Sequence, residues 1–429
     1  MVGSVRLFDY RCFRREAPAT LPLASGFTAF VGPNNAGKSA LIRSVYELRS
    51  SLGPLLQLGT NAQSMVANTF GFQTLPPMYE AAEIVTDRED PKCSVELIAD
   101  ALVSPASLEV QRVVLTFSAN ASQFVVKVYG SDGREIGVPG SQTAFGANQG
   151  SKLPTSDGHI YDTEAIVRLL ETILQTQFVG PFRNAINEGA GGHFDTQIGT
   201  GFIAQWHNWK TGVSKAQNRA IERVTEDVRR LIGAQSLEIT ASNELKTLQV
   251  VLDRRPHKLQ ELGSGIAQMI VVLGNALIRQ PSFIIIDEPE IHLHPGLQLE
   301  FLTTLASYAK FGVLFATHSI GLARSAADHC FTVQKVERGS IVRAFSRTPH
   351  YAEFLGSLGI AGLQDIGWDR ILLVEGTTDV RTFQHLLRLY GKDRKTVVLP
   401  LGGDSMANGN VAIELSEVVR FGGKDRGHS

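Results

Sequence analysis

The sequence predicts an α/β fold in which a phosphate-binding loop and an acidic strand end lie at one edge of a parallel sheet. The segment Gly32–Ser39 reads GPNNAGKS and directly follows an apolar run, Phe27–Val31. A second apolar run, Phe283–Ile286, ends in Asp287 and Glu288. Runs that are apolar on both faces suit central parallel strands, and open α/β sheets bind ligands at the carboxyl ends of such strands. The two segments therefore predict one ligand site built from distant parts of the chain.

The glycine-rich segment has the spacing of a phosphate loop, G-x-x-x-x-G-K-[ST], between a strand and a helix. Glycines let backbone N–H groups surround phosphate oxygens, and the helix start adds its positive end. Lys38 is expected to reach the β- and γ-phosphates, and the Ser39 hydroxyl to ligate Mg²⁺. The spacing and the flanking elements favour this interpretation over a chance glycine turn. The nucleotide contacts expected from the loop are Gly32, Asn34, Asn35, Gly37, Lys38 and Ser39.

Three residues at predicted strand ends are candidates for the chemistry of this site. Asp287 is expected to hold Mg²⁺, directly or through water, and Glu288 is the candidate general base that polarises the attacking water. The strand Val313–Thr317 ends in His318, which at that position can hydrogen-bond a γ-phosphate. A lone histidine is more often structural, but the position of this one beside the site favours a functional role.

A second glycine-rich helix start lies upstream of the acidic strand. Gly263, Ser264 and Gly265 precede a long apolar helix, and helix N-termini bind anions. One nucleotide does not need two such loops, so we expect these residues to contact the γ-phosphate bound on a second subunit. The alternative is a helix cap that binds no ligand. His292 and His294 follow the acidic strand without a third ligand, so positioning of a dimer interface and of the water is favoured over a metal site.

Composition excludes several classes of protein. The chain has 429 residues, 43% of them hydrophobic, and a formal net charge of −1, so we expect two or three globular domains and no overall polycation. Contact with DNA would have to come from a local basic patch. Cys12, Cys93 and Cys330 form neither a disulfide framework nor a zinc pattern. The start lacks the apolar core of a signal peptide and no apolar run spans a membrane, so we expect a cytoplasmic protein with no membrane contact.

The rest of the chain predicts one further sheet and several helices. Strands of an antiparallel sheet are expected at 93–98, 113–117 and 124–129. A helix is expected over 162–177, with Asp162 as its N-cap. In another helical segment, 214–232, apolar residues share one face and charges of both signs alternate elsewhere. We favour a solvated amphipathic helix there, and a DNA-facing or dimer-forming arm is the alternative.

The motifs GPNNAGKS, ELGSG, FIIIDEPEIHLHP and ATHS occur in this order along the chain. In this combination residues 1–340 resemble the ABC-type ATPase heads of the RecF/SMC-like group. The resemblance implies ATP and Mg²⁺ as cofactors and two heads that sandwich two ATP molecules, each site using the phosphate loop of one head and Gly263–Gly265 of the other. The Q-loop glutamine of such heads has no assignable counterpart here, and Arg183 stands where this group often carries an arginine.

The C-terminal segment resembles the beginning of a Rossmann-like Toprim domain. The apolar run Ile371–Val374 ends at Glu375, and Asp379 follows four residues later. An ABC-type head followed by Toprim is the arrangement of the OLD (overcoming lysogenisation defect) family of ATP-dependent nucleases. The resemblance implies that Glu375 is a general base or metal ligand and that Asp379 is a further ligand for Mg²⁺ or Mn²⁺. The family's Asp-x-Asp pair on the next strand is missing, so we expect a fragment or an incomplete nuclease half.

The expected organisation is an ABC-type P-loop head over 1–345, with an antiparallel β subdomain and a helical dimerisation insertion at about 184–233. A connector over 346–368 and a partial Toprim domain over 369–429 follow. The expected function is an ATP-binding and hydrolysing head of an OLD-like DNA endonuclease in phage defence, with nucleotide state regulating the nuclease. The alternatives are a nucleotide-dependent sensor that docks a separate effector or helicase-like protein, and a RecF-like DNA-repair ATPase. The expected partners are DNA and further copies of the chain, as a homodimer or higher oligomer.

Overall fold

The computed structural model divides the chain into two compact units. One unit comprises residues 1–293 and 299–345, and the other comprises 294–298 and 346–429. The described residues are 2–62, 69–71, 81–85, 92–101, 107–118, 123–136, 149–180, 191–242, 244–290, 293–345, 370–374, 379, 382–383, 386–387, 389–390, 392 and 396–400. The first unit contains every element of the candidate nucleotide site.

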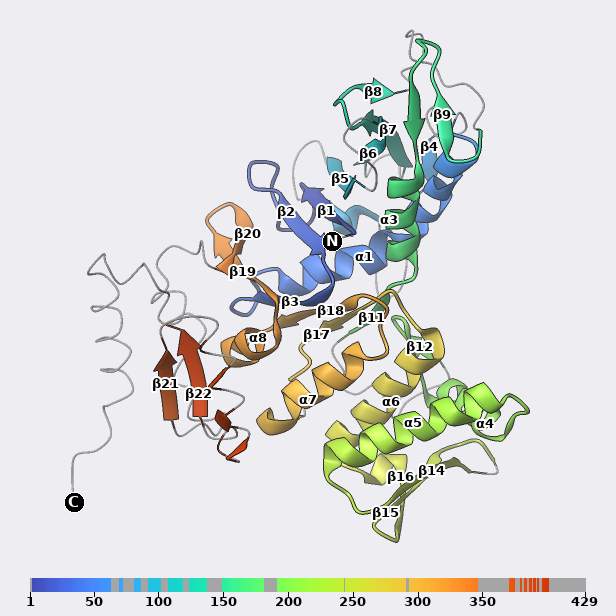
Figure 1. Cartoon of the computed structure of the whole chain (residues 1–429), viewed down its shortest axis with the longest axis vertical. Helices are drawn as coiled ribbons and strands as arrows, with labels where there is room; N and C mark the ends of the chain where they lie inside the picture. Colours follow the sequence, from blue (N-terminus) through green and yellow to red (C-terminus); the bar gives the residue numbers. More distant parts are fainter. Residues whose placement is uncertain are drawn as a thin grey trace, which may run out of the picture. The chain divides into compact units, whose positions relative to one another are not determined.

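A mostly parallel sheet with the strand order β11-β17-β18-β3-β19-β20 forms the centre of the first unit (Figure 1). Every residue of β17 and β18 is buried, which explains why both strands are continuous apolar runs rather than alternating ones. β18 pairs in parallel with β17 on one side and with β3 on the other, so the carboxyl ends of these three strands meet at one edge. The bounds are β3 Gly26–Val31, β11 Gln177–Val179, β17 Phe283–Asp287, β18 Gly312–Thr317, β19 His329–Val336 and β20 Gly339–Ala344.

A second, antiparallel sheet has the order β2-β1-β5-β6-β7-β4, with β8 paired to β7. Alternate residues are buried along β7, from Phe124 to Val128, which is the period of a strand with one face on the core. The antiparallel sheet predicted from the sequence is confirmed. The bounds are β1 Gly3–Phe8, β2 Ala19–Leu23, β4 Thr69–Gly71, β5 Lys92–Ala99, β6 Val110–Ser118, β7 Gln123–Gly130 and β8 Glu135–Ile136.

Helix α1 (Lys38–Leu52) lies between the two sheets and contacts β17 and β18 of one and β2 of the other. Its Glu47 carboxylate is buried and pairs with Arg11 and Arg43, each at 2.7 Å. Tyr10 donates a hydrogen bond to the same carboxylate, and burial raises the pKa of that phenol well above its usual value. The helix that follows the phosphate loop is therefore tied to the turn after β1 by a buried polar cluster.

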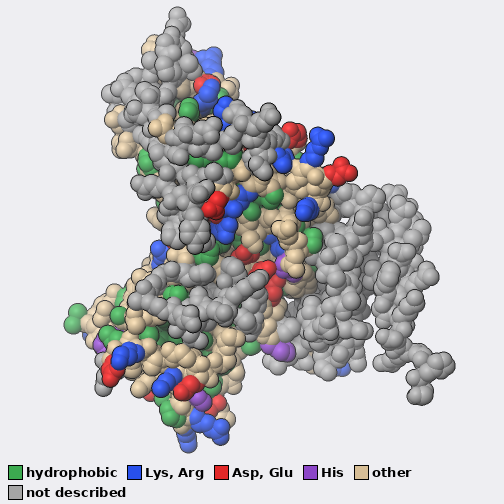
Figure 2. All heavy atoms as spheres, turned by 180° about the vertical axis from the view of Figure 1, so that it is seen from behind, with side chains coloured by type: hydrophobic (Ala, Val, Ile, Leu, Met, Phe, Trp, Pro, Cys, Tyr) green, Lys and Arg blue, Asp and Glu red, His purple; other side chains and the backbone are tan. Residues whose placement is uncertain are grey.

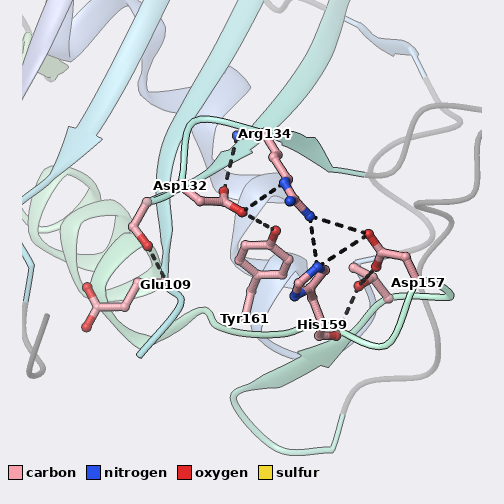
Figure 3. A network of polar contacts seen from close by, with 8 residues as sticks. Glu109, Asp132, Arg134, Asp157, His159 and Tyr161 are labelled. Atoms are coloured by element: carbon pink, nitrogen blue, oxygen red, sulfur yellow. Dashed lines mark hydrogen bonds and ion pairs between the residues drawn. The ribbon is translucent and has the colours of Figure 1, made fainter. Parts of the chain in front are cut away.

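A polar network attaches the β9–β10 hairpin to the turn between β7 and β8 (Figure 3). Tyr161 donates to Asp132 at 3.0 Å, and burial together with this carboxylate raises the pKa of Tyr161 to about 12. Arg134 lies 2.8 Å from His159 Nε2 and 4.0 Å from Asp157. The Tyr161 ring and the paired charges thus hold the β9–β10 hairpin against the turn between β7 and β8. The bounds are β9 Lys152–Pro154 and β10 Ile160–Asp162.

Helix α3 (Glu164–Leu174) follows β10 and packs against β5 and β6. The N-cap position is Thr163, one residue later than the sequence predicts. Asp162 still contributes, because its carboxylate accepts a hydrogen bond from Glu164 N at 2.9 Å. The predicted helix is present, and its cap is shifted because Asp162 also ends β10 and pairs with Lys152 at 2.6 Å.

A helical lobe precedes the acidic strand. On α5 the buried residues are Ile221, Val224, Val228 and Leu231, and this face packs against α4, α6 and β14. Its outer face carries ion pairs between neighbouring turns, such as Arg229 with Glu226, so the helix is amphipathic and solvated. The bounds are α4 Gly199–Thr211, α5 Lys215–Ile232, α6 Ser264–Arg279, β12 Gly191–His193, β13 Thr196–Ile198, β14 Leu237–Ala241, β15 Leu248–Leu252 and β16 Arg255–Lys258.

Asp195, in the turn of the β12–β13 hairpin, connects this lobe to the helix of the phosphate loop. Its carboxylate pairs with Arg49 of α1 and with Arg279 of α6, each at 2.8 Å, and accepts from Phe178 N at 2.8 Å. The side chain is only 7% exposed. The guanidinium groups outweigh the effect of burial, so the pKa of Asp195 lies below its usual value. The ends of two helices that begin at glycine-rich motifs therefore share one carboxylate.

Replacing Asp195 by asparagine is expected to lower the free energy of unfolding by about 2–4 kcal/mol, because two guanidinium groups lose their buried partner. A carboxyl group with a lowered folded-state pKa contributes stability above its unfolded pKa of about 4, and that contribution disappears as pH falls through the folded pKa. Urea titrations at pH 7 and at decreasing acid pH should show the two proteins converging. The control is Glu238→Gln: Glu238 is 70% exposed and lies 3.7 Å from Lys210, so a change within about 0.5 kcal/mol is expected. An equal effect of both substitutions would contradict the structural role of Asp195.

The second unit contains a two-stranded parallel sheet of β21 (Arg370–Val374) and β22 (Thr396–Pro400). The sequence pattern over residues 411–421 is typical of a further helix, and this segment lies outside the described residues. In the described part of the chain, no helix combines the length and apolar character that crossing a membrane requires. Other helical elements in the described part of the chain are η1 Gly53–Gly59, η2 Ala81–Ile84, η3 Leu259–Glu261, α7 Pro295–Ala306 and α8 Ile320–Ala326.

Candidate nucleotide-binding site

The predicted phosphate loop connects β3 to α1 at the carboxyl edge of the parallel sheet. Gly37 has φ 98° and Asn35 has φ 61°, so the loop curls through left-handed conformations just before the helix. A Cβ atom added to Gly32 would lie 2.2 Å from Val333 O, and one added to Gly37 would lie 2.5 Å from Cys12 Sγ. The two motif glycines are therefore also required by close contacts from β19 and from the turn after β1.

Lys38 is buried and faces back across the loop. Its Nζ donates to Gly32 O at 2.9 Å and to Pro33 O at 3.0 Å, and it lies 3.1 Å from His318 Nε2. Desolvation lowers the pKa of Lys38 to about 8, against the opposing pull of Glu288 and other acids. Among the described residues, the groups within hydrogen-bond distance of this desolvated ammonium are two carbonyls and the His318 ring, so it is well suited to gain from a phosphate anion.

Asp287 at the end of β17 fits a magnesium ligand. Its carboxylate accepts a hydrogen bond from the Ser39 hydroxyl, and its Oδ1 is buried without a partner among the described residues. Burial, with a smaller contribution from Glu288, raises the pKa of Asp287 to about 6. A hydroxyl and a carboxylate oxygen are hard donors of the kind that Mg²⁺ prefers, and a cation would satisfy the unpartnered oxygen. The structure thus brings together the two residues that the sequence assigns to Mg²⁺.

Glu288 and His318 lie side by side across the ends of β17 and β18. Glu288 Oε1 is 3.2 Å from His318 Nε2, the nitrogen that Lys38 also approaches. A carboxylate needs a donor and an ammonium needs an acceptor, so this nitrogen serves only one of them at a time. Desolvation and Lys38 lower the pKa of His318, which favours the neutral ring. The three residues predicted from three separate motifs form one continuous chain of polar contacts.

Glu290 is a site residue that sequence analysis did not assign. Its Oε1 accepts from the Thr317 hydroxyl at 2.7 Å and from His318 N at 2.9 Å. Burial raises the pKa of this carboxyl above its usual value. The acidic character of the DEPE segment was visible in the sequence, but the pairing of Glu290 with Thr317 depends on β17 and β18 being neighbours.

Gly263, Ser264 and Gly265 form the beginning of α6 rather than part of the phosphate-loop cluster. Gly263 is the N-cap position and no side chain caps the helix. Gly263 and Ser264 are exposed, and a Cβ added to Gly263 would meet nothing within 4 Å. Within the described residues no hydrogen bond joins this segment to the phosphate loop, so its ligand contact remains a prediction.

Several predicted residues lie outside what the structure describes. These are Arg183, His292 and Glu375, whereas Asp379 belongs to a described helical position of the second unit. Across the described residues, no cluster of three or more His, Cys, Asp or Glu side chains could hold a metal ion. The assignment of Glu375 and Asp379 to a metal stays a prediction.

The affinity of the protein for ATP is expected to fall as pH rises above about 8. Only the ammonium form of Lys38 attracts phosphate, and its pKa in the free protein is about 8. Affinity should therefore be nearly constant from pH 6.5 to 7.5 and weaken by about fivefold between pH 8 and pH 9. Fluorescent-nucleotide titrations across this range measure the effect.

The matched control for this pH dependence is Lys38→Arg, because a guanidinium group stays charged throughout the range. This variant should bind more weakly than the original protein at pH 7 but show a flat profile up to pH 9.5. A flat profile for the unaltered protein, or a decline shared by the arginine variant, would contradict the assignment of the titration to Lys38.

Comparison with known proteins gives partial matches. Residues 208–324 match the family described as "AAA domain, putative AbiEii toxin, Type IV TA system". The molybdenum import ATP-binding protein ModC of Paramagnetospirillum magneticum is 34% identical over 88 residues, which are 20% of this chain and 23% of that protein. The lipoprotein-releasing system ATP-binding protein LolD of Ehrlichia ruminantium is 30% identical over 131 residues, 29% of this chain and 54% of that protein. The chain thus spans about half or less of these curated relatives.

Among solved structures, the chain is similar to an SMC head bound to the C-terminal winged-helix domain of ScpA, with a TM-score of 0.44 and 13% identity. That match covers 80% of this chain and 98% of the other. The SMC head domain from Thermotoga maritima gives a TM-score of 0.40 and 16% identity, covering 80% of this chain and 97% of the other.

The fold is a mixed α/β one in which a phosphate loop, an acidic strand end and a histidine strand end meet at the edge of a parallel sheet. An antiparallel sheet and a helical lobe complete the unit. The matched family is described as an AAA domain, and both curated relatives are named as ATP-binding proteins. The first unit therefore has the fold and the motifs of a mixed α/β P-loop domain, and parts of it are similar to ATP-binding domains of the AAA/ABC type.

Proposed function

We propose that this chain binds ATP with Mg²⁺, hydrolyses it, and acts as the head of an OLD-like protein whose nucleotide state controls a C-terminal Toprim segment acting on DNA. The observation that carries the ATPase proposal is the contact chain from Lys38 through His318 to Glu288. Lys38 would bind the β- and γ-phosphates, and Ser39 and Asp287 would hold the cation, which neutralises charge on the transferring phosphoryl group.

In this proposal Glu288 polarises the attacking water and His318 orients the γ-phosphate. The raised pKa of Asp287, about 6, and the lowered pKa of Lys38, about 8, have the same origin in a site that is partly withdrawn from water. In such a site fixed charges interact more strongly with a transferring phosphoryl group than they would in bulk water. Perturbed titratable groups clustered at the carboxyl edge of a parallel sheet support a catalytic site over a purely structural one.

We further propose that Gly263–Gly265 of one copy complete the site of another. The exposed start of α6, which has no side-chain cap, presents free N–H groups and the positive end of a 16-residue helix to an incoming phosphate. Among the described residues of one chain, the start of α6 makes no hydrogen bond to the phosphate loop or to His318. A second copy is the simplest source of a γ-phosphate for this helix.

Ser264→Glu is expected to abolish hydrolysis without weakening ATP binding, because its carboxylate would repel a γ-phosphate at the helix start. Each variant alone should be inactive, and an equal mixture of Ser264→Glu and Lys38→Ala should restore about a quarter of the original activity. In such a mixture about half of the dimers contain one copy of each variant, and one of the two sites in each mixed dimer is intact. The control is Ser236→Glu at an exposed serine of the same lobe, which should retain activity. Failure of the mixture to regain activity would contradict a site shared between copies.

The DNA-directed part of the proposal rests on resemblance and on the β21–β22 parallel pair, whose first strand ends immediately before Glu375. On the face of the molecule drawn in Figure 2, the described lysine and arginine side chains are interspersed with acidic ones, so binding to DNA would use a local patch. Plasmid cleavage with Mg²⁺ or Mn²⁺, with and without ATP, tests the proposal. Glu375→Gln and Asp379→Asn should lose cleavage, and Asp393→Asn should keep it. ATP-dependent partner binding without any cleavage would instead favour the sensor alternative.

A further inference from the structure

The Glu290 carboxylate occupies a buried position beside the hydrolysis site that none of the proposed catalytic roles uses. One oxygen, Oε1, accepts from the Thr317 hydroxyl at 2.7 Å and from His318 N at 2.9 Å. The other oxygen, Oε2, is buried without a hydrogen-bond partner among the described residues. Burying a carboxylate oxygen without a hydrogen-bond partner costs free energy of folding, so we expect Glu290 to have a role that offsets this cost.

The two bonds fix the turn that carries His318. Thr317 donates its hydroxyl proton to Glu290 and accepts from Ser319 N at 2.9 Å. The Ser319 hydroxyl in turn accepts from Leu322 N at 3.1 Å and caps α8. Glu290 therefore accepts the hydrogen bond of the His318 N–H directly. It also holds the Thr317 hydroxyl, which accepts the hydrogen bond of the Ser319 N–H. The direction of the His318 ring depends on this backbone.

The path of the chain explains why Glu290 can reach β18. Glu288 N continues the ladder of β17 by donating to Ala316 O at 2.9 Å. Glu288 then adopts φ 53°, a left-handed conformation that reverses the chain direction within one residue. Two residues later the side chain of Glu290 returns to the end of β18. The same turn thus presents Glu288 to the His318 ring and Glu290 to the His318 backbone.

We propose that Glu290 is a positioning residue for ATP hydrolysis. It holds the His318 backbone so that the imidazole meets Glu288 and the γ-phosphate in the correct geometry, and it does not itself contact the nucleotide. This inference rests on the proposed ATPase function and adds a residue to it. A residue acting in this way affects turnover rather than nucleotide affinity, and it has no effect when the histidine ring is absent.

Glu290→Ala is expected to lower kcat about 10- to 100-fold while the Kd for ATP changes less than threefold, because it leaves the His318 N–H and the Thr317 hydroxyl without their acceptor. Glu290→Gln keeps an oxygen at the same place and should stay within about threefold of the original kcat. Glu96→Gln is the matched control. This mostly buried carboxylate belongs to the antiparallel sheet and pairs with Arg6 and Arg112. Because it lies outside the nucleotide site, its loss should leave the ratio of kcat to Kd unchanged.

The decisive comparison uses His318→Ala as the background. There, Glu290→Ala should lower kcat less than twofold further, since its effect passes through the missing ring. The proposal would be overturned if the two substitutions together lowered kcat by the product of their separate effects. It would also be overturned if Glu290→Ala alone left kcat unchanged.

Hydrogen exchange at backbone amides tests the role of Glu290 without a measurement of ATP hydrolysis. Without nucleotide, Glu290→Ala should speed exchange at least tenfold at His318 and Ser319, and Glu290→Gln should restore protection. Unchanged exchange at these amides would overturn the proposal even if activity fell. If the original protein hydrolyses no ATP, the proposed function fails, while the exchange comparison still decides whether Glu290 holds this turn.

Discussion

Replacing Lys38 by alanine is expected to weaken ATP binding at least about 100-fold, which corresponds to about 3 kcal/mol. The ammonium is buried at the phosphate loop, and its hydrogen-bond partners among the described residues are two carbonyl oxygens and the His318 ring. A triphosphate would provide the charge-assisted bonds that this group lacks in the free protein. Isothermal titration with ATP and Mg²⁺ at pH 7 measures the loss directly.

Thermal unfolding separates this loss of binding from a loss of folding. Desolvation lowers the pKa of Lys38 to about 8, so the charged form disfavours the folded state at neutral pH. The alanine variant should therefore unfold at a temperature no lower than the original protein when ATP is absent. Lys310→Ala, at a lysine that lies over the ring of Phe311, serves as a control and should bind ATP normally. Unchanged nucleotide affinity in Lys38→Ala would remove the phosphate-loop assignment.

Replacing Glu288 by glutamine is expected to lower kcat about 100- to 1,000-fold and to leave ATP affinity within about threefold. Glutamine has the same shape and can still contact His318, but its amide cannot take a proton from water. The separation of turnover from binding follows because Lys38, Ser39 and Asp287 are unaltered. Steady-state phosphate release and nucleotide titration on the same preparation give both quantities.

Glu300→Gln provides the comparison for this substitution, because Glu300 is exposed on α7. Its kcat should equal that of the original protein. Normal hydrolysis by Glu288→Gln would rule out Glu288 as the base and would leave His318 or a residue outside the described part of the chain to orient the water. Loss of ATP binding in Glu288→Gln would instead indicate that the carboxylate organises the loop through His318 and Lys38.

Short motifs allowed the nucleotide-facing half of the site to be predicted. The phosphate loop, the Asp287–Glu288 strand end and His318 each carry their chemistry within a few residues, and each follows an apolar strand that is readable as such. Since β3, β17 and β18 pair in parallel, the carboxyl ends of these strands meet, and the motif residues come together without further information. The antiparallel sheet was equally predictable, because its strands alternate buried and exposed residues.

The contacts that hold the helices and the histidine turn in place could not be predicted from short motifs. Asp195 binds Arg49 and Arg279, residues 146 and 84 positions away, and nothing in the sequence around it distinguishes it from a solvated aspartate in a turn. The hydroxyl of Thr317 and the carboxylate of Glu290 likewise meet only after two strands have paired. Such contacts depend on packing between distant segments, for which a single sequence carries no local signal.

The sequence by itself predicted a nucleotide site, the residues expected to face the phosphates, and parallel strands around them, because those features depend on local spacing and hydrophobic pattern. Only the tertiary structure decided that Lys38, His318 and Glu288 form one contact chain, that Asp287 keeps an unpartnered oxygen, and that Glu290 supports the histidine turn. The physical reason is that pKa shifts and buried hydrogen bonds arise from desolvation and from neighbours in space. Those neighbours are set by how β17, β18 and the phosphate loop pack.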